Sequence, residues 1–389
     1  MEIVKEKIKQ IGPLLDELDV DLWLVFVRET AVHSDPILPL VVGLEATWQS
    51  FFAYCRDGRS YALIGNLDEA DYLRSGNFTQ VIPYTTGVGE DLRSLLSRLD
   101  PRTIAINYSL DNPSADGLSY GLYLRLLEYL KGTPYADRLI SAEAVCTKVR
   151  ARKTQYELKL LEAANKVACD VWREAVTQVR TGMTEAAVAG LIDGLLRGHG
   201  AEPSFETIVN AGAKTQPGHG SPTDARLEPG DLLHIDFGAR IFEYCSDIQR
   251  VLYFRRPGED APPEELTEAF AMVNSIITNA AKNCRPGVKG HEVDAGARAT
   301  LVDDGYVEYQ HALGHQLGRA VHDGGALIGP KWERYGKAPD IELEAGNVFT
   351  LELEINLPGI GCVGLEEDVV VEPNGARIFG TRQTELDVK

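Results

Sequence analysis

The sequence predicts two domains: an α/β domain over residues 1–150, and a second domain over residues 151–389 in which one arrangement of helices and strands occurs twice. Three observations lead to this prediction. A chain of 389 residues is too long for one ordinary hydrophobic core. Short apolar segments alternate with helical segments in the first part, and a weak internal repeat marks the second part.

The elements of the first domain follow from hydrophobic patterning. Its first ten residues are charged and amphipathic, so we expect a helix there and not a signal peptide. Short continuous apolar runs are typical of buried strands. The segments expected to be strands are residues 21–27, 51–54, 61–64 and 103–107, and those expected to be helices lie near residues 68–74 and 118–130. Asp57 and Gly58 predict a hairpin turn between the second and third strands.

The boundary between the domains is expected at a polar segment. Residues 148–154 carry four basic side chains among seven positions. They lead into residues 155–178, where apolar side chains recur at helical spacing, which predicts a long amphipathic helix. We therefore place the boundary between residues 150 and 151.

The second domain contains the internal repeat. Residues 180–188 and 285–293 share an arginine, a glycine, an apolar residue and a valine in register, and each segment follows a predicted helix. Each copy continues into a second helix and then into strands that contain two acidic residues. Two pseudo-symmetric halves would each bring a pair of strands with two carboxylates to one central site.

The composition excludes several classes of partner and location. The formal net charge of -19 should repel nucleic acid and anionic membranes, and no lysine or arginine cluster opposes it. No run of about 18 apolar residues could span a bilayer. The six cysteines have neither a C-x-x-C motif nor dense spacing, so no disulfide framework is indicated. We expect a cytoplasmic protein that binds neither nucleic acid nor membranes.

Two aspartates lie in apolar strands of the first repeat half. Asp236 follows Leu-Leu-His-Ile, and Asp247 precedes Ile-Gln-Arg-Val-Leu-Tyr-Phe. A turn near residues 241–243 would fold these strands into an antiparallel hairpin and bring the two carboxylates together. Two such charges are costly unless a cation bridges them. The alternative is a structural ion pair of one aspartate with Arg240 or Arg250, and this pattern alone leaves both possibilities open.

The second half contains two glutamate pairs. Alternation over residues 347–355 places Glu352 and Glu354 on one face of a strand. One of the two can face a metal, and the alternative is that both are simply solvated. Glu366 and Glu367 point to opposite faces of the next strand, so only one of them can belong to the same site. Periodicity does not choose within either pair.

A histidine-rich segment completes the candidate site. Residues 311–322 hold three histidines, His311, His315 and His322, and contain two glycines. Imidazole is both a neutral metal ligand and a proton carrier near physiological pH. One histidine alone would more often be structural, but three beside strands of buried acids favour a functional site.

These segments resemble the metallopeptidase family with the pita-bread fold, which comprises methionine aminopeptidase, aminopeptidase P and prolidase. The family's motifs match in order over residues 150–389, including Thr350-Leu-Glu352 and Val363-Gly-Leu-Glu366. The preceding domain resembles the creatinase-type N-terminal domain of aminopeptidase P and prolidase. The resemblance therefore implies an α/β creatinase-like domain followed by an α+β pseudo-symmetric pita-bread catalytic domain.

The resemblance implies a set of metal ligands and a mechanism. The family's ligands map onto Asp236, Asp247, His315, Glu352 and Glu366. They would hold two divalent ions, and manganese, cobalt and zinc all suit this ligand set. Asp247 and Glu366 would be shared by both ions, Asp236 would bind one of them, and His315 and Glu352 the other. A hydroxide between the ions would be the nucleophile, with Glu352 as the proton acceptor for the attacking water.

Further residues match positions near the substrate in this family. His219 matches a histidine on the substrate-side loop, and His322 matches one that contacts the scissile carbonyl. His311 matches a residue that supports the ligands or lines the pocket. Arg319, at a position that is usually apolar, is either a substrate contact or a surface arginine.

The chain also departs from the family pattern. Gly364 stands where prolidases and aminopeptidases P usually have an arginine, Gln249 stands where a threonine is expected, and Leu353-Glu354 replaces Pro-Gly. The arginine is a contact for the substrate carboxylate or part of a supporting salt bridge. Its loss leaves open whether proline is required in the substrate.

The favoured prediction is a metal-dependent exopeptidase that cleaves after the N-terminal residue of short peptides, with Xaa-Pro peptides as the expected substrates. The first alternative is a hydrolase or lyase of a small non-peptide substrate on the same fold, as creatinase-like relatives are. The second is a catalytically inactive module that binds protein, which the complete ligand set argues against. Relatives of this type pair through their N-terminal domains, so a homodimer is expected.

Overall fold

The computed structural model describes residues 2–212, 215 and 220–389 of the chain. The chain divides into two compact units, one that ends at Tyr156 and one from Glu157 to Lys389. This division falls a few residues after the boundary predicted between residues 150 and 151, and the assignment of the units to the two predicted domains stays a prediction.

The N-terminal unit is built on one mixed sheet of six strands in the order β4-β3-β2-β1-β5-β6. The strands are β1 Leu22–Val27, β2 Ser50–Cys55, β3 Ser60–Gly65, β4 Gln80–Tyr84, β5 Ile104–Ile106 and β6 Leu139–Ser141. β2 and β3 pair antiparallel around Gly58, which has a φ of 85°, so the predicted hairpin is confirmed.

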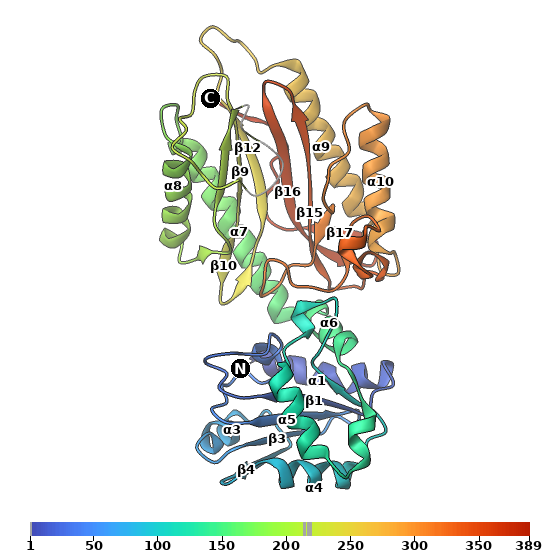
Figure 1. The fold of residues 1–389 in the computed structure, drawn as a ribbon. Helices are drawn as coiled ribbons and strands as arrows, with labels where there is room; N and C mark the ends of the chain where they lie inside the picture. The colour runs from blue at the N-terminus through green and yellow to red at the C-terminus, as the bar shows by residue number, and fades with distance from the viewer. Residues whose placement is uncertain (1, 213–214, 216–219) are drawn as a thin grey trace. The chain divides into compact units, whose positions relative to one another are not determined.

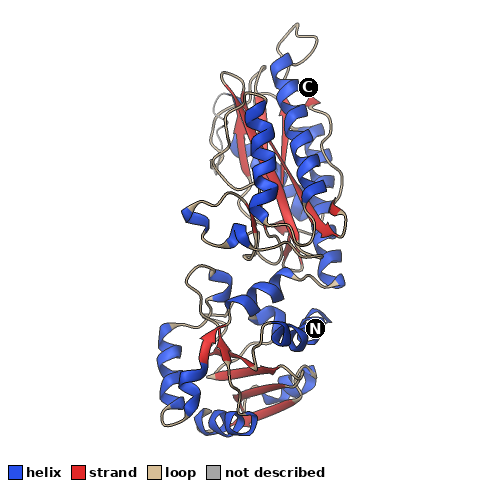
Figure 2. Ribbon diagram, turned by 90° about the vertical axis from the view of Figure 1, so that its right-hand side faces the viewer, coloured by secondary structure: helices blue, strands red, loops and turns tan. Residues whose placement is uncertain are grey.

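Helices cover both faces of this sheet, as Figure 2 shows. They are α1 Glu2–Glu17, α2 Leu38–Val41, α3 Glu69–Ser75, α4 Gly89–Leu99, α5 Tyr120–Leu130 and α6 Glu143–Ala151. Successive side chains of a strand point to opposite faces. Trp23 and Val25 of β1 therefore pack into the core under α1 and α6, while Leu24 and Phe26 pack into the core under α4 and α5. Burial on both faces explains why this strand reads as an unbroken apolar run.

The C-terminal unit contains long curved strands with helices outside them (Figure 1). Its helices are α7 Gln155–Gln178, α8 Glu185–Gly198, α9 Glu264–Asn283 and α10 Gly290–Asp303. Its central strands are β8 Ile208–Ala211, β9 Leu232–Phe237, β12 Ile248–Tyr253, β15 Val348–Leu357 and β16 Gly361–Glu372. The shorter strands are β7 Glu202–Pro203, β10 Ala239–Ile241, β11 Tyr244–Cys245, β13 Gly314–His315, β14 Leu327–Ile328, β17 Gly375–Ile378 and β18 Asp387–Val388.

Two antiparallel strand pairs form the middle of this unit. β9 pairs with β12, as predicted from the two aspartate segments, and β15 pairs with β16. β12 and β16 lie side by side and join the two pairs (Figure 1). α7 and α8 pack with β8, β9 and β12 in one core, and α9 and α10 pack with β15 and β16 in the other.

The internal repeat is confirmed in the turns that precede α8 and α10. Gly182 and Gly287 occupy equivalent positions and have φ angles of 87° and 86°. Gly182 N donates to Leu227 O at 2.8 Å, and Gly287 N donates to Leu343 O at 2.9 Å. A positive φ is accessible to glycine without steric cost, which explains why both copies retain it.

The same equivalence extends to the turns that lead into β9 and β15. Gly230 and Gly346 have φ angles of 97° and 84°. The side chain of Asp231 accepts a hydrogen bond from Glu228 N, and the side chain of Asn347 accepts one from Glu344 N. Two short side-chain acceptors thus start the two ligand-bearing strands in the same way.

A buried ion pair connects β12 to β16. Arg250 Nη2 lies 2.9 Å from Glu367 Oε2, and each side chain is 1% exposed. Arg250 Nη1 also donates to Glu366 O at 2.8 Å. The pair connects the two halves of the unit from within, and Arg382 Nε lies a further 3.7 Å from Glu367 Oε1.

We predict that Glu367→Gln lowers the free energy of unfolding by about 3 kcal/mol, because the substitution removes the carboxylate that pairs with the buried Arg250 charge. Urea denaturation of the chelated protein measures this change. The control is Glu162→Gln, which breaks an exposed pair between Glu162 and Arg377 and should cost less than about 1 kcal/mol. Equal losses in the two variants would contradict the prediction.

Candidate metal centre

The C-terminal unit brings five predicted site residues to the inner side of its central strands. Neighbouring strands place them there because every second side chain of a strand faces the same way. Asp236 lies on β9, Asp247 directly precedes β12, His315 ends β13, Glu352 lies on β15 and Glu366 lies on β16.

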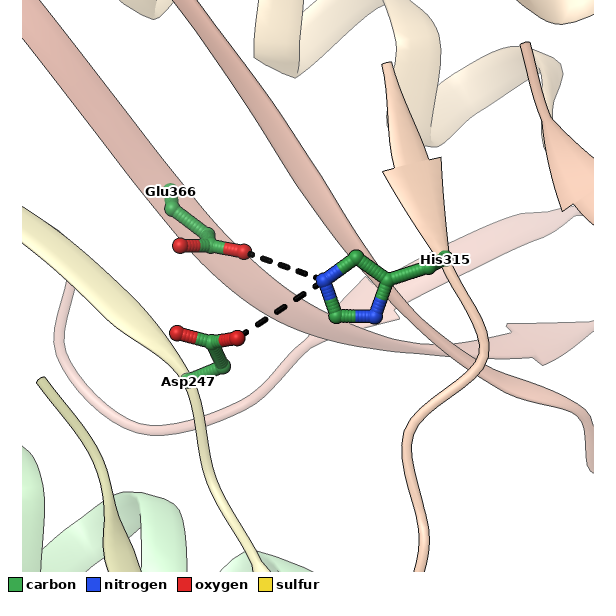
Figure 3. Close-up of side chains that lie close together, drawn as sticks. All are labelled: Asp247, His315 and Glu366. Atoms are coloured by element: carbon green, nitrogen blue, oxygen red, sulfur yellow. Dashed lines mark ion pairs between the residues drawn. The ribbon is translucent and has the colours of Figure 1, made fainter. Parts of the chain in front are cut away.

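Three of these residues form a compact cluster. Asp247, His315 and Glu366 each offer a ligand atom, and these atoms lie within 4.8 Å of one another. His315 Nε2 is 3.7 Å from Asp247 Oδ2 and 3.9 Å from Glu366 Oε1. Dashed lines in Figure 3 mark these two ion pairs. The same nitrogen is 3.8 Å from Glu352 Oε1. One imidazole nitrogen therefore faces three carboxylates.

Asp236 lies beside this cluster. It pairs with Gln249 across β9 and β12. Burial, and then the charge of Glu352, raise the pKa of Asp236 to about 8, while a hydrogen bond with Asp247 opposes the shift. Its position next to both residues makes it available as a further ligand.

The electrostatics of the cluster are those of acids in a confined, apolar space. Burial, and then the charge of Glu366, raise the pKa of Asp247 well above its ordinary value. Burial, and then the charge of Glu352, do the same to the pKa of Glu366. Burial raises the pKa of Glu352 to about 7, and burial together with His322 lowers the pKa of His315 to about 3. At neutral pH, protons therefore remain on the carboxyl groups until a cation displaces them.

Unsatisfied oxygen atoms show that the residues fit a metal. Asp236 Oδ1, Asp247 Oδ1 and Glu366 Oε1 are buried, and they lack a hydrogen-bond partner among the described residues. A buried polar atom without a partner carries a desolvation cost, which a divalent cation can offset. Carboxylates with one imidazole suit first-row divalent metals.

The two arginines that were considered as structural partners of the aspartates pair with glutamates instead. Arg250 pairs with Glu367, and Arg240 lies 3.9 Å from Glu243. The two neighbouring glutamates of β16 also have different surroundings. Glu366 faces the cluster, whereas Glu367 lies on the opposite side with Arg250.

Glu354 lies on the same face as Glu352 but has a different partner. Its Oε2 is 2.5 Å from His311 Nε2. Burial alone would lower the pKa of His311, but the hydrogen bond with Glu354 and the charge of Glu352 raise it to about 9. His311 is therefore a cation at neutral pH, held next to the cluster and not within it.

His322 is exposed at the edge of the cluster. Its ring is perpendicular to that of His315, with a centroid distance of 4.3 Å. The guanidinium carbon of Arg319 lies 5.6 Å from the centroid of the Tyr244 ring. His219 lies outside the described residues. The substrate contacts expected for these side chains stay predictions.

Two residues that support the cluster were not identified from the sequence as such. Gln249 Nε2 donates to Glu352 Oε2 at 2.9 Å and to Glu366 Oε2 at 3.0 Å. Asp368 accepts from Asp247 N, with 3.3 Å to each carboxylate oxygen, and its Oδ2 accepts from Asn165 Nδ2 at 2.8 Å. Each lies two positions after a ligand candidate, so strand alternation was the available signal.

Comparison with known proteins gives a consistent family match. A model of metallopeptidase family M24 matches residues 159–373. A Xaa-Pro dipeptidase of Pyrococcus horikoshii is 26% identical over 99% of this chain and 100% of its own. An uncharacterized peptidase of Bacillus subtilis is 33% identical over 70% of this chain and 72% of its own.

Solved structures give the same fold. The structure of a Xaa-Pro dipeptidase from Bacillus anthracis matches with a TM-score of 0.77 and 23% identity, and the match covers 99% of each chain. Within the described residues, the chain has no helix with the length and apolar character needed to cross a membrane.

We predict that metal binding releases protons and strengthens with rising pH. Since the pKa values of Asp236 and Glu352 are raised to about 8 and about 7, a cation must displace protons from the site below these values. Titration of the chelated protein with Mn²⁺ in buffers of different ionisation enthalpy should show more protons released at pH 6.5 than at pH 8.5.

The raised pKa values of Asp236 and Glu352 also determine the direction in which stability changes with pH. Raised carboxyl pKa values contribute stability that is fully present below the unfolded-state values and is lost as pH rises through about 7 to 8. Saturating Mn²⁺ should reverse this loss. Proton release that does not vary with pH would contradict the prediction, and Asp247→Asn combined with Glu366→Gln should abolish the metal-dependent signal.

Proposed function

The chain belongs to metallopeptidase family M24 and is a metal-dependent exopeptidase of its prolidase and aminopeptidase P branch, and from this we propose that it cleaves Xaa-Pro peptides with two divalent ions. The observation that carries the proposal is the buried cluster of Asp247, His315 and Glu366. The names of the relatives from Pyrococcus horikoshii and Bacillus anthracis support the choice of substrate.

The fold class implied by the family resemblance is confirmed, because the structural neighbours are prolidases of that fold and cover nearly the whole chain. An N-terminal α/β unit precedes a C-terminal unit that carries the site. The fold alone does not define a substrate, so the substrate is argued from the site.

We assign the two ions to residues that the structure gathers. Asp247 and Glu366 would be shared between them, Asp236 would complete one set, and His315 with Glu352 the other. Bound divalent ions lower the pKa of water and polarise carbonyl groups. Manganese, cobalt and zinc all suit these ligands.

The side chains around the cluster then have distinct tasks. Glu352 would accept and return the proton of the attacking water, because its Oε1 lies 3.8 Å from His315 Nε2 within the cluster. His322 is exposed beside His315, where it can donate a hydrogen bond to the carbonyl of the scissile bond. His311, charged and fixed by Glu354, presents a cation near the substrate. His219 and Arg319 remain proposed substrate contacts.

The substrate panel tests this proposal. Chelated enzyme reconstituted with Mn²⁺, Co²⁺ or Zn²⁺ should hydrolyse Xaa-Pro peptides faster than matched Xaa-Ala peptides. Dipeptides alone would indicate a dipeptidase, and turnover of Xaa-Pro-Yaa tripeptides would indicate an open pocket. Equal rates for Xaa-Ala would overturn the proline preference. No peptide hydrolysis at full metal occupancy would overturn peptidase activity on these substrates and favour a small non-peptide substrate.

We predict that Asp247→Ala and Glu352→Ala each reduce kcat/KM by at least about a thousandfold, since removal of an electrostatic group that acts in the transition state typically costs two to three orders of magnitude and metal is lost as well. Steady-state kinetics with metal analysis measures both effects. Glu372→Ala, at an exposed residue paired with Arg377, is the control and should retain parent activity. Near-parent activity in both site variants would exclude this assignment.

We also propose a homodimer that acts in the cytoplasm. The location is supported by six buried cysteines that form no disulfide. Size-exclusion chromatography with light scattering at micromolar concentration should give about twice the mass of one chain. A mass of one chain across the dilution range would count against the dimer.

A further inference from the structure

Gln249 has an unusual position for a neutral side chain. It lies on β12, two residues after Asp247, and therefore faces the same side of the strand. Its Nε2 donates to Glu352 Oε2 at 2.9 Å and to Glu366 Oε2 at 3.0 Å. One NH₂ group has two hydrogens, so a single amide satisfies one oxygen of each glutamate.

The second oxygen of each glutamate points the other way. Glu352 Oε1 and Glu366 Oε1 lie 3.8 Å and 3.9 Å from His315 Nε2. The amide therefore fixes the rotation of both carboxylates and leaves their Oε1 atoms directed at the cluster. This is the arrangement that a metal-binding carboxylate needs before the ion arrives.

His234 fixes the orientation of the amide. His234 Nε2 lies 3.1 Å from Gln249 Oε1, on the neighbouring strand β9. Because Gln249 Oε1 is an acceptor, this nitrogen of His234 must carry the hydrogen. If the amide turned over, its oxygen would face two carboxylates and its NH₂ group would face a donor. Both contacts would be repulsive.

Gly364 provides the space for this pair. It lies opposite Glu354 on β16. A Cβ at this position would lie 2.6 Å from His234 Nε2 and 2.8 Å from Gln249 Oε1, which is closer than real Cβ contacts. No side chain fits there while His234 and Gln249 keep their places, so the glycine at position 364 leaves room for this pair.

We propose that Gln249 is a positioning residue that orients Glu352 and Glu366 for metal binding, and that His234 holds Gln249 in a space kept open by Gly364. Two positions that depart from the family pattern, Gln249 and Gly364, thus act together with His234. The inference rests on the proposed metal centre, and metal binding, not turnover, is its readout.

The experiment measures the dissociation constant of Mn²⁺ by calorimetry and the Tm of the chelated protein. Gln249→Ala should raise the dissociation constant about tenfold, the lower end of the effect of residues that support metal ligands. His234→Leu should raise it less. The double variant should match Gln249→Ala alone, because His234 acts through Gln249. Gly364→Ala should also weaken binding, whereas Gly194→Ala, in open space on α8, should not.

The matched control is Gln383→Ala. Gln383 is a buried glutamine whose amide donates to Val251 O at 2.7 Å and accepts from Val251 N at 3.0 Å on the same strand as Gln249. Its loss should lower the Tm and leave the Mn²⁺ dissociation constant unchanged. A purely structural role for Gln249 would give the same result as this control.

The outcomes separate the two proposals. Parent protein that binds no Mn²⁺, Co²⁺ or Zn²⁺ would overturn the metal centre itself. Parent protein that binds metal, with Gln249→Ala within twofold of it, would overturn only the role of Gln249. Strict additivity in the double variant would overturn the role of His234. Weaker binding in Gln249→Ala and not in Gln383→Ala supports the proposal even if every peptide of the panel is left intact.

Discussion

The mutual repulsion of buried carboxylates is the constraint on which the rest of the C-terminal unit depends. Asp236, Asp247, Glu352 and Glu366 share a space from which water is largely removed, and their pKa values are raised by burial and by one another. Such a group is tolerable only if protons or cations neutralise it. The fold must therefore supply enough stability elsewhere to hold these acids together, and the two apolar cores outside the strands do so.

The charged neighbours of the cluster are arranged so that they do not compete with a metal for the ligand oxygens. Arg250 is the cation closest in sequence to the ligands, but it lies on the opposite face of its strand with Glu367. Asp368 accepts from the backbone of Asp247 and from Asn165, so it anchors the chain and not the metal. Strand alternation keeps the arginine charge away from the ligands. An arginine on the inner face would have occupied the oxygens that a metal requires.

Many strands and the paired halves of the C-terminal unit could be predicted from the sequence. The inner face of β16 and the contacts between distant strands could not, for a physical reason. Apolar runs and their spacing gave the strands, and the repeat gave the paired halves. The choice of Glu366 over Glu367 needed either the family resemblance or the structure, because alternation shows that the two differ but not which face is inside. The roles of Gln249 and His234 depend on the register between β9, β12 and β16. Register between strands far apart in the chain is not visible in local patterning.

The glycine that makes room for His234 and Gln249 also leaves this part of the metal site without an arginine charge. An arginine at position 364 would place a cation opposite residue 354, whereas this chain has glycine there and an acid at Glu354. The cation beside Glu354 is instead His311, with a pKa of about 9 and a hydrogen bond to Glu354. A substrate carboxylate that approaches His311 would meet a positive charge that is already paired with the carboxylate of Glu354. Recognition of a free C-terminus by this part of the site would then be weaker than where an unshared arginine binds it.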